Sequence, residues 1–130
     1  MSKLSPACPD KIPVKPVLSE LTRILSDDDK RILFVGIGNV LKQDDGAGVY
    51  ISNRLISNAK TEVLTAEVSI ENYIGKINSI GPDILIIIDC VDMGMPPGSC
   101  RMLKTSGISD LTFNTHNISL KRISDFFNAE

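Results

Sequence analysis

Residues 31–48, with the sequence RILFVGIGNVLKQDDGAG, contain the pattern that decides the fold. After its first residue, the stretch 31–35 is apolar without polar alternation, which is typical of a central strand in a parallel sheet whose two faces are both covered. A glycine-containing loop, residues 36–45, follows, and apolar residues then recur at helical intervals as far as Leu55. This order predicts a strand near 31–36, a glycine loop and a helix of about three turns.

The same order of strand and helix recurs further along the chain. Residues 62–66 are expected to form a second strand, residues 72–80 a second helix, and the apolar run 84–88 a third strand. Gly81 and Pro82 predict the end of the second helix. Because helical crossovers require parallel strands, we expect an α/β fold: a three-layer sandwich with a mostly parallel, twisted sheet and helices on both faces.

The two ends of the chain have weaker patterns. Apolar residues at helical spacing predict a short helix over Val17–Leu25, so that residues 1–30 form an N-terminal arm and residues 31–130 the α/β domain. Further on, residues 100–104 are expected to form an edge strand, and a last amphipathic helix is expected to end near Phe127.

The composition indicates one globular domain. The chain has 130 residues, of which 42% are hydrophobic and 23% charged, with a formal net charge of −2. This balanced charge argues against a nucleic-acid partner. The longest strongly apolar run, residues 84–88, is too short to insert into a membrane, which takes about 20 apolar residues. Three cysteines without a C-x-x-C pair, and no secretory signal, favour a cytoplasmic protein.

Polar residues follow the predicted strands at the edge where α/β sheets bind ligands. Asp44 and Asp45 come after the first strand, Asp89 follows the third strand, and His116 precedes the last predicted helix. Because the carboxyl ends of parallel strands meet at one edge, we expect Asp45, Asp89 and His116 to converge there. Asp44 is instead expected to cap the helix that follows it.

Two carboxylates and one imidazole form a mixed oxygen and nitrogen ligand set. Imidazole suits nickel, zinc, copper or iron, whereas oxygen donors alone would suit magnesium or calcium. Three protein ligands leave coordination positions open for substrate groups. Hydrolysis by two carboxylates without a metal is the alternative, and it gives His116 no role.

A nucleotide-binding oxidoreductase is a further alternative, because Gly36 and Gly38 follow a predicted strand. The third glycine of a G-x-G-x-x-G motif would fall at Leu41, which is too bulky for close contact between helix and strand. The second predicted strand also ends in Thr65 and Ala66, without an acidic residue for a ribose. These residues disfavour a dinucleotide site, and the two glycines are better explained by a tight turn.

Three segments resemble, in order, the signatures of the nickel-iron hydrogenase maturation proteases. They are residues 36–48 (GIGNVLKQDDGAG), 87–98 (IIDCVDMGMPPG) and 115–117 (THN). Members of that family are endopeptidases that remove a C-terminal extension from the hydrogenase large subunit after nickel has been inserted.

The resemblance implies that Asp45, Asp89 and His116 contact the metal and act in catalysis. The implied metal is nickel, delivered with the substrate on its cysteine thiolates, and another divalent metal such as zinc or cadmium is expected to substitute for it. The implied partner is the precursor of a hydrogenase large subunit.

Two features differ from the pattern of that family. Ala66 and Glu67 stand where members often have two glycines, so Glu67 is expected to add negative charge and bulk near the site. Members also continue past the histidine-bearing helix, whereas this sequence ends soon after Phe126 and Phe127. The last strand and helix are therefore expected to be missing, with apolar surface around Ile118, Ile123 and Phe127 uncovered. The alternative function is a truncated or non-catalytic remnant that binds the metal or the large subunit.

Overall fold

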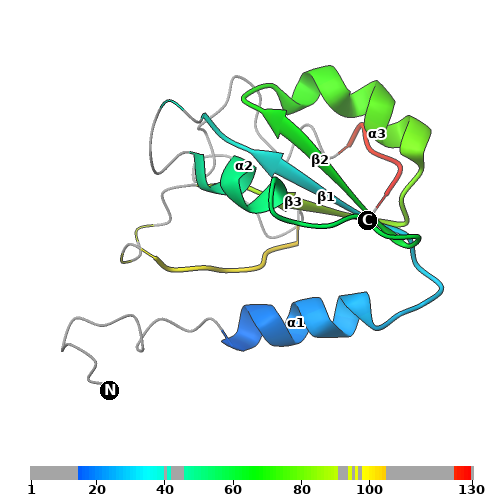
Figure 1. Ribbon diagram of the computed structural model, residues 1–130, viewed down its shortest axis with the longest axis horizontal. Coiled ribbons are helices and arrows are strands. Elements are labelled where there is room, and N and C mark those ends of the chain that lie inside the picture. The colour runs from blue at the N-terminus through cyan, green and yellow to red at the C-terminus, as the bar shows by residue number, and fades with distance from the viewer. Residues whose placement is uncertain are drawn as a thin grey trace.

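The computed structural model describes residues 15–39, 41, 46–90, 94, 96, 98–104 and 125–129. Its elements, in chain order, are α1 (Lys15–Leu25), β1 (Ile32–Ile37), α2 (Ala47–Ser52), β2 (Thr61–Glu67), the 3-10 helix η3 (Ile70–Tyr73), α3 (Ile74–Ile80) and β3 (Ile84–Ile88) (Figure 1). Within these ranges, no helix has the length and apolar character needed to span a membrane.

The three strands form one parallel sheet in the order β2-β1-β3. In the central strand β1, Ile32 pairs with Thr61 of β2 and with Ile84 of β3, and Gly36 pairs with Ile88 near the other end of β3. Every residue of β1 is buried, which suits an apolar strand covered on both faces. The predicted α/β class and the parallel direction of these strands are confirmed.

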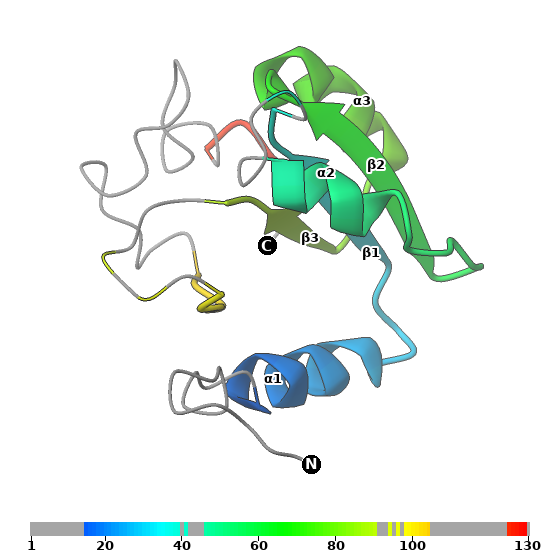
Figure 2. The ribbon, with the colours of Figure 1, turned by 60° about the vertical axis from the view of Figure 1, so that its left-hand side comes forward.

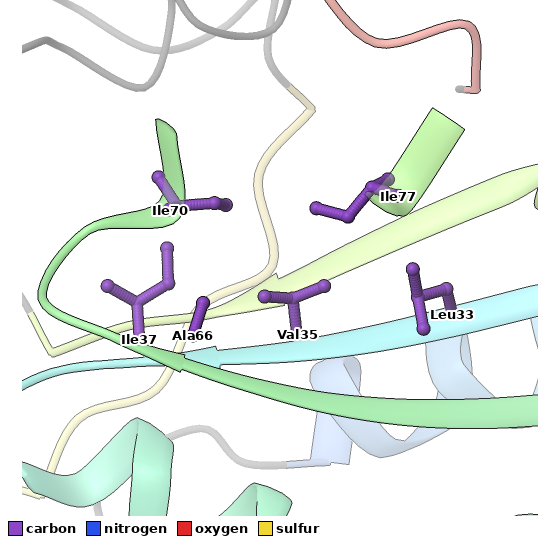
Figure 3. Packing of buried hydrophobic residues seen from close by; sticks show 6 residues of the cluster. All are labelled: Leu33, Val35, Ile37, Ala66, Ile70 and Ile77. Carbon is purple, nitrogen blue, oxygen red and sulfur yellow. The ribbon is translucent and has the colours of Figure 1, made fainter. Parts of the chain in front are cut away.

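Alternate residues of β1 build the main core on one face of the sheet. Leu33, Val35 and Ile37 point toward Ile70 of η3 and Ile77 of α3, and all five side chains are at most 1% exposed (Figure 3). Burying one such side chain contributes about 1.5–3 kcal/mol relative to leaving it in water. Because side chains alternate along a strand, this apolar set determines which face receives η3 and α3.

Helix α2 packs against the opposite face of β1, where Gly36 leaves room for it (Figure 3). A Cβ atom on Gly36 would lie 2.2 Å from Oγ of Ser52 and 2.5 Å from the backbone oxygen of Gly48, both in α2. Only a residue without a side chain permits this approach. Helices therefore lie on both faces of β1 (Figure 2).

The helices differ in length from the sequence prediction. Helix α2 has six residues and ends before Leu55. The predicted second helix begins as η3 and continues as α3, and it ends at Gly81 as expected. Gly81 has a φ of +68°, and its N–H donates to the carbonyl oxygen of Ile77 at 3.1 Å, which forms a glycine cap. Residues 100–104 form no strand, because no described strand pairs with them, so that prediction is wrong.

Helix α1 lies to one side of the sheet, and none of its residues is buried (Figure 1, Figure 2). Lys60, which directly precedes β2, contacts the end of α1. Its Nζ donates to the carbonyl oxygen of Leu25 at 2.6 Å and forms an ion pair with Asp28 at 3.4 Å. The division into an arm, residues 1–30, and a domain, residues 31–130, stays a prediction.

The segment 125–129 lies against α3. Nδ2 of Asn78 donates to the carbonyl oxygen of Phe126 at 2.8 Å, and Oδ1 of Asn78 accepts from the N–H of Asn128 at 3.0 Å. Phe127 packs against the main core, so the expectation that it is uncovered is wrong, whereas Phe126 is 63% exposed. The rest of the predicted last helix lies outside the described residues.

Candidate functional site

The three described strands end at one edge of the sheet, which we call the carboxyl edge. Gly36 of β1 pairs with Ile88, and Ile37 pairs with Glu67, so the chain leaves the three strands at about the same level. Asp89 is the first residue after Ile88. It therefore lies at the edge where ligands bind in α/β sheets, as the sequence predicts.

The carboxylate of Asp89 is half-buried at the end of β3. Its Oδ1 accepts a hydrogen bond from the backbone N–H of Cys90 at 2.8 Å. This contact with the next residue holds the carboxylate at the end of the strand.

Gly48 brings the first turn of α2 directly onto the carboxyl edge. A Cβ atom on Gly48 would lie 2.3 Å from the backbone oxygen of Ile37 and 2.3 Å from that of Ile88. Both oxygens belong to strand backbones, which cannot move without disturbing the sheet. The start of α2 is thus seated between the ends of β1 and β3, against the residue that precedes Asp89.

The loop that leaves β1 is anchored to β2. The N–H of Gly38 donates to the carbonyl oxygen of Glu67 at 2.9 Å, and Gly38 has a φ of +153°, a conformation that favours glycine. Oδ1 of Asn39 then accepts from the N–H of Leu41 at 2.9 Å, which forms an Asx turn. The tight turn predicted at the two glycines is thus not seen at either of them: Gly38 bonds to β2, and Gly36 serves the contact with α2.

A buried hydroxyl holds the other end of α2 against β2. Ser52 is 2% exposed, and its Oγ lies 2.8 Å from Oγ1 of Thr65 and 3.0 Å from the carbonyl oxygen of Val49. Oγ1 of Thr65 also lies 3.1 Å from Oδ1 of Asn53, to which it donates. These side chains connect α2 to the last residues of β2, next to the carboxyl edge.

Of the three proposed metal ligands, the structure describes Asp89 alone. Asp45 and His116 lie outside the described residues, so the convergence of the three stays a prediction. Among the described residues, to which Asp45 and His116 do not belong, no three potential metal ligands lie together. Asp44 also lies outside the described residues, so its predicted role as a helix cap stays a prediction; in the described part of the chain, Gly46 directly precedes α2.

Glu67 has a backbone conformation that the sequence did not reveal. It is the one non-glycine residue with positive φ, +54°, in the part of the chain that the structure describes. An L-residue with a side chain is strained there by about 1–2 kcal/mol. The register between β1 and β2 shifts beside Glu67, between Gly36 and Ile37. The sole sequence signal was the glycine that the resembling family often has at this place.

Glu71 lies on η3, which follows the carboxyl end of β2. Its Oε2 is buried and has no hydrogen-bond partner among the described residues. A buried acceptor without a donor is uncommon in folded proteins. The segment from Glu67 to Glu71 therefore contains two carboxylates. One of them, that of Glu71, has an oxygen without a hydrogen-bond donor among the described residues.

Comparisons with known proteins agree on one family. The sequence model of the family HycI, described as hydrogenase maturation protease, matches residues 49–127. A protein of Methanocaldococcus jannaschii that is named as a hydrogenase maturation protease is 30% identical over 115 residues, which are 78% of this chain and 68% of the relative. The hydrogenase 3 maturation protease of Escherichia coli K12 is 32% identical over 92 residues, which are 68% of this chain and 59% of the relative.

A solved structure agrees in fold. The crystal structure of the NiFe hydrogenase maturation protease HycI of Thermococcus kodakarensis matches with a TM-score of 0.65 and 25% sequence identity, over 82% of this chain and 70% of that chain. The present chain thus spans between 59% and 70% of the length of these three proteins.

Proposed function

The chain belongs to the HycI family of hydrogenase maturation proteases, and from this premise we propose that it removes the C-terminal extension of a nickel-iron hydrogenase large-subunit precursor after nickel insertion. Family membership assigns it to the peptidases and gives it a role in hydrogenase maturation. Because the chain spans 68% of one relative and 59% of another, its own activity is part of this proposal.

The proposed site consists of Asp45, Asp89 and His116. The observation that carries it is the contact between Gly48 and Ile88, where a Cβ atom on Gly48 would lie 2.3 Å from the Ile88 oxygen. Gly48 lies three residues after Asp45, and Ile88 immediately precedes Asp89. This contact supports a site in which the two carboxylates act on one ion.

The chemistry of the donor set fits nickel. Two carboxylate oxygens and one imidazole nitrogen suit a borderline divalent ion, and open positions remain for groups that the substrate supplies. In this proposal, nickel is part of the substrate and arrives on its cysteine thiolates. Asp45, Asp89 and His116 complete the coordination of that nickel and so hold the adjacent scissile peptide at the carboxyl edge.

The test is to incubate the full chain with a nickel-loaded large-subunit precursor and to measure the mass of the precursor. The proposal expects the loss of a C-terminal peptide with the unaltered chain, and no loss with Asp45→Asn, Asp89→Asn or His116→Ala. Asp44→Asn is the matched control, since it removes the neighbouring carboxylate and is expected to retain activity.

Nickel-dependent binding without cleavage would instead support the alternative function, a non-catalytic member that binds the large subunit. Cleavage that survives Asp89→Asn would contradict the shared-metal site. We further propose that the reaction takes place in the cytoplasm, which three cysteines without a C-x-x-C pair favour.

A further inference from the structure

The segment 125–129 is anchored to the rest of the fold through one side chain of α3 and one ring. Nδ2 of Asn78 donates to the carbonyl oxygen of Phe126 at 2.8 Å, and Oδ1 of Asn78 accepts from the N–H of Asn128 at 3.0 Å. Between these two bonds, the side chain of Phe127 packs against the main core. One amide thus holds the backbone on both sides of a residue whose side chain the core holds.

Asparagine suits this contact because its carboxamide carries both a donor and an acceptor. It therefore satisfies the carbonyl oxygen of one residue and the N–H of a second residue two positions later. The two bonds join positions that are 48 and 50 residues apart in the sequence, so they are tertiary contacts and not part of a local turn. Alanine in place of Asn78 would remove both bonds, and aspartate would keep only the acceptor.

The anchor lies toward the edge at which the strands begin, opposite the carboxyl edge. The chain of η3 and α3 runs back along the sheet: Ile70 lies over the carboxyl end of β1, and Ile77 lies over the stretch between Val35 and Leu33, nearer the start of β1 (Figure 3). Asn78 directly follows Ile77. The backbone that Asn78 holds is therefore fixed at a point remote from the proposed metal site.

The distance across the sheet matches the length of chain between His116 and the anchor. Strand β1 has six residues, Ile32–Ile37, so its ends are about 17 Å apart at about 3.3 Å per residue. Phe126 lies ten residues after His116 (126 − 116), and the sequence predicts a helix between them. At about 1.5 Å per residue, such a helix rises about 15 Å. A helix that ends at the anchor thus has the length to bring His116 to the carboxyl edge.

We propose that Asn78 is a positioning residue of the site: with Phe127, it fixes the end of the segment that carries His116, and so sets how far the imidazole reaches toward the ion at Asp89. This inference rests on the proposed function, because it assumes that His116 coordinates the nickel of the substrate. Metal affinity depends on the residues that orient the ligands, and a displacement of about 1 Å can cost about 100-fold in rate.

The test measures, by calorimetry, the affinity of the full chain for a short synthetic peptide whose two cysteines hold one nickel ion. Asn78→Ala is expected to weaken binding by about 10-fold. In the His116→Ala background, the same replacement is expected to change the affinity by less than about twofold, because the residue through which Asn78 acts is absent. A residue that only stabilises the fold would give the same change in both backgrounds.

Two further variants complete the experiment. Asn72→Ala is the matched control: Asn72 is exposed on η3, its side chain makes no hydrogen bond among the described residues, and its replacement should leave the affinity within about twofold. Asn78→Asp keeps the side-chain size and the acceptor for Asn128 and loses the donor to Phe126, so a smaller weakening, about threefold, is expected. Circular dichroism verifies that each variant is folded, and faster hydrogen exchange at the N–H of Asn128 verifies that Asn78→Ala releases the anchor.

The outcomes distinguish this inference from the proposed function. If His116→Ala weakens binding but Asn78→Ala has no effect, or has the same effect in both backgrounds, the role of Asn78 is overturned and the metal site stays intact. Binding by His116→Ala as tight as that of the unaltered chain would contradict the metal site and this inference with it. Failure of the unaltered chain to bind the nickel peptide would overturn both.

Discussion

Replacing Gly48 by alanine tests how α2 is seated on the carboxyl edge. The new Cβ atom would lie 2.3 Å from the backbone oxygen of Ile37 and 2.3 Å from that of Ile88, both about 1 Å closer than ordinary contact. Neither oxygen can retreat alone, because Ile37 and Ile88 belong to neighbouring hydrogen-bonded strands. Helix α2 must therefore move away from the sheet.

The free energy of unfolding should fall by about 2 kcal/mol. Overpacking of this kind costs about 1–3 kcal/mol, and two backbone contacts place Gly48 at the upper end of that range. Replacing glycine by alanine within a helix offsets about 1 kcal/mol of that cost. The remaining loss is a large part of a typical stability of about 5–15 kcal/mol and corresponds to a melting temperature lower by about 8 °C.

The assay is urea unfolding followed by circular dichroism, with Gly75→Ala as the matched control. Gly75 lies in α3, is exposed, and would have nothing within 4 Å of an added Cβ atom. Its replacement should raise the free energy of unfolding by about 0.5–1 kcal/mol, the helix preference of alanine over glycine. If Gly48→Ala is stabilised to the same extent as Gly75→Ala, the close contact between α2 and the ends of β1 and β3 is refuted.

Three further predictions concern the same edge of the sheet. Glu67→Gly should raise the free energy of unfolding by up to about 1 kcal/mol, because glycine accepts a φ of +54° without strain; a thermal melt that shows a clear loss would argue against a strained position. Ser52→Ala should cost about 1 kcal/mol in urea unfolding, and no more, because Thr65 keeps its bond to Asn53 at 3.1 Å; a cost near zero would mean that the Ser52 hydroxyl does not hold α2. Removal of nickel from the precursor with a chelator should abolish binding by the full chain, whereas the Asp45→Asn variant should bind weakly with or without nickel; tight binding of the metal-free precursor, measured by calorimetry, would exclude recognition through the ion.

Strand β1 could be predicted because its residues satisfy two constraints at once. Its apolar part is a continuous run of residues that favour strands, and burial on both faces demands such a run. Ile84–Ile88 is a similar run of residues that favour strands, and each of its residues is partly buried. Gly81 likewise identified the end of α3, since a glycine in the left-handed conformation ends many helices.

The remaining features depend on contacts between distant segments. The sequence motif contains Gly48, but only the fold shows that two strand oxygens occupy the space of its missing side chain. The positive φ of Glu67 arises where the register of β1 and β2 shifts, which depends on pairing across 30 residues of chain (67 − 37). Helix α2 ends at Ser52 although apolar residues continue at helical spacing to Leu55. The spacing of apolar residues therefore overestimated its length.

For the site itself, the structure confirms that Asp89 lies at the carboxyl edge, as the sequence predicts. Its role as a metal ligand, and both the position and the role of Asp45 and His116, stay predictions that rest on topology and on the resemblance. The edge between the start of α2 and the end of β3 is narrow, because Gly48 contacts the oxygen of Ile88. A site that uses residues from both sides of this contact is the arrangement that the described fold supports best.

The decisive experiment measures the mass of a nickel-loaded large-subunit precursor after incubation with the full chain or with its Asp89→Asn variant. If Asp89 acts on the precursor's nickel, the unaltered chain removes a C-terminal peptide only when nickel is present, and the variant, folded as judged by circular dichroism, removes none. Equal cleavage by both proteins, or cleavage of nickel-free precursor, would contradict the claim that Asp89 acts on the precursor's nickel.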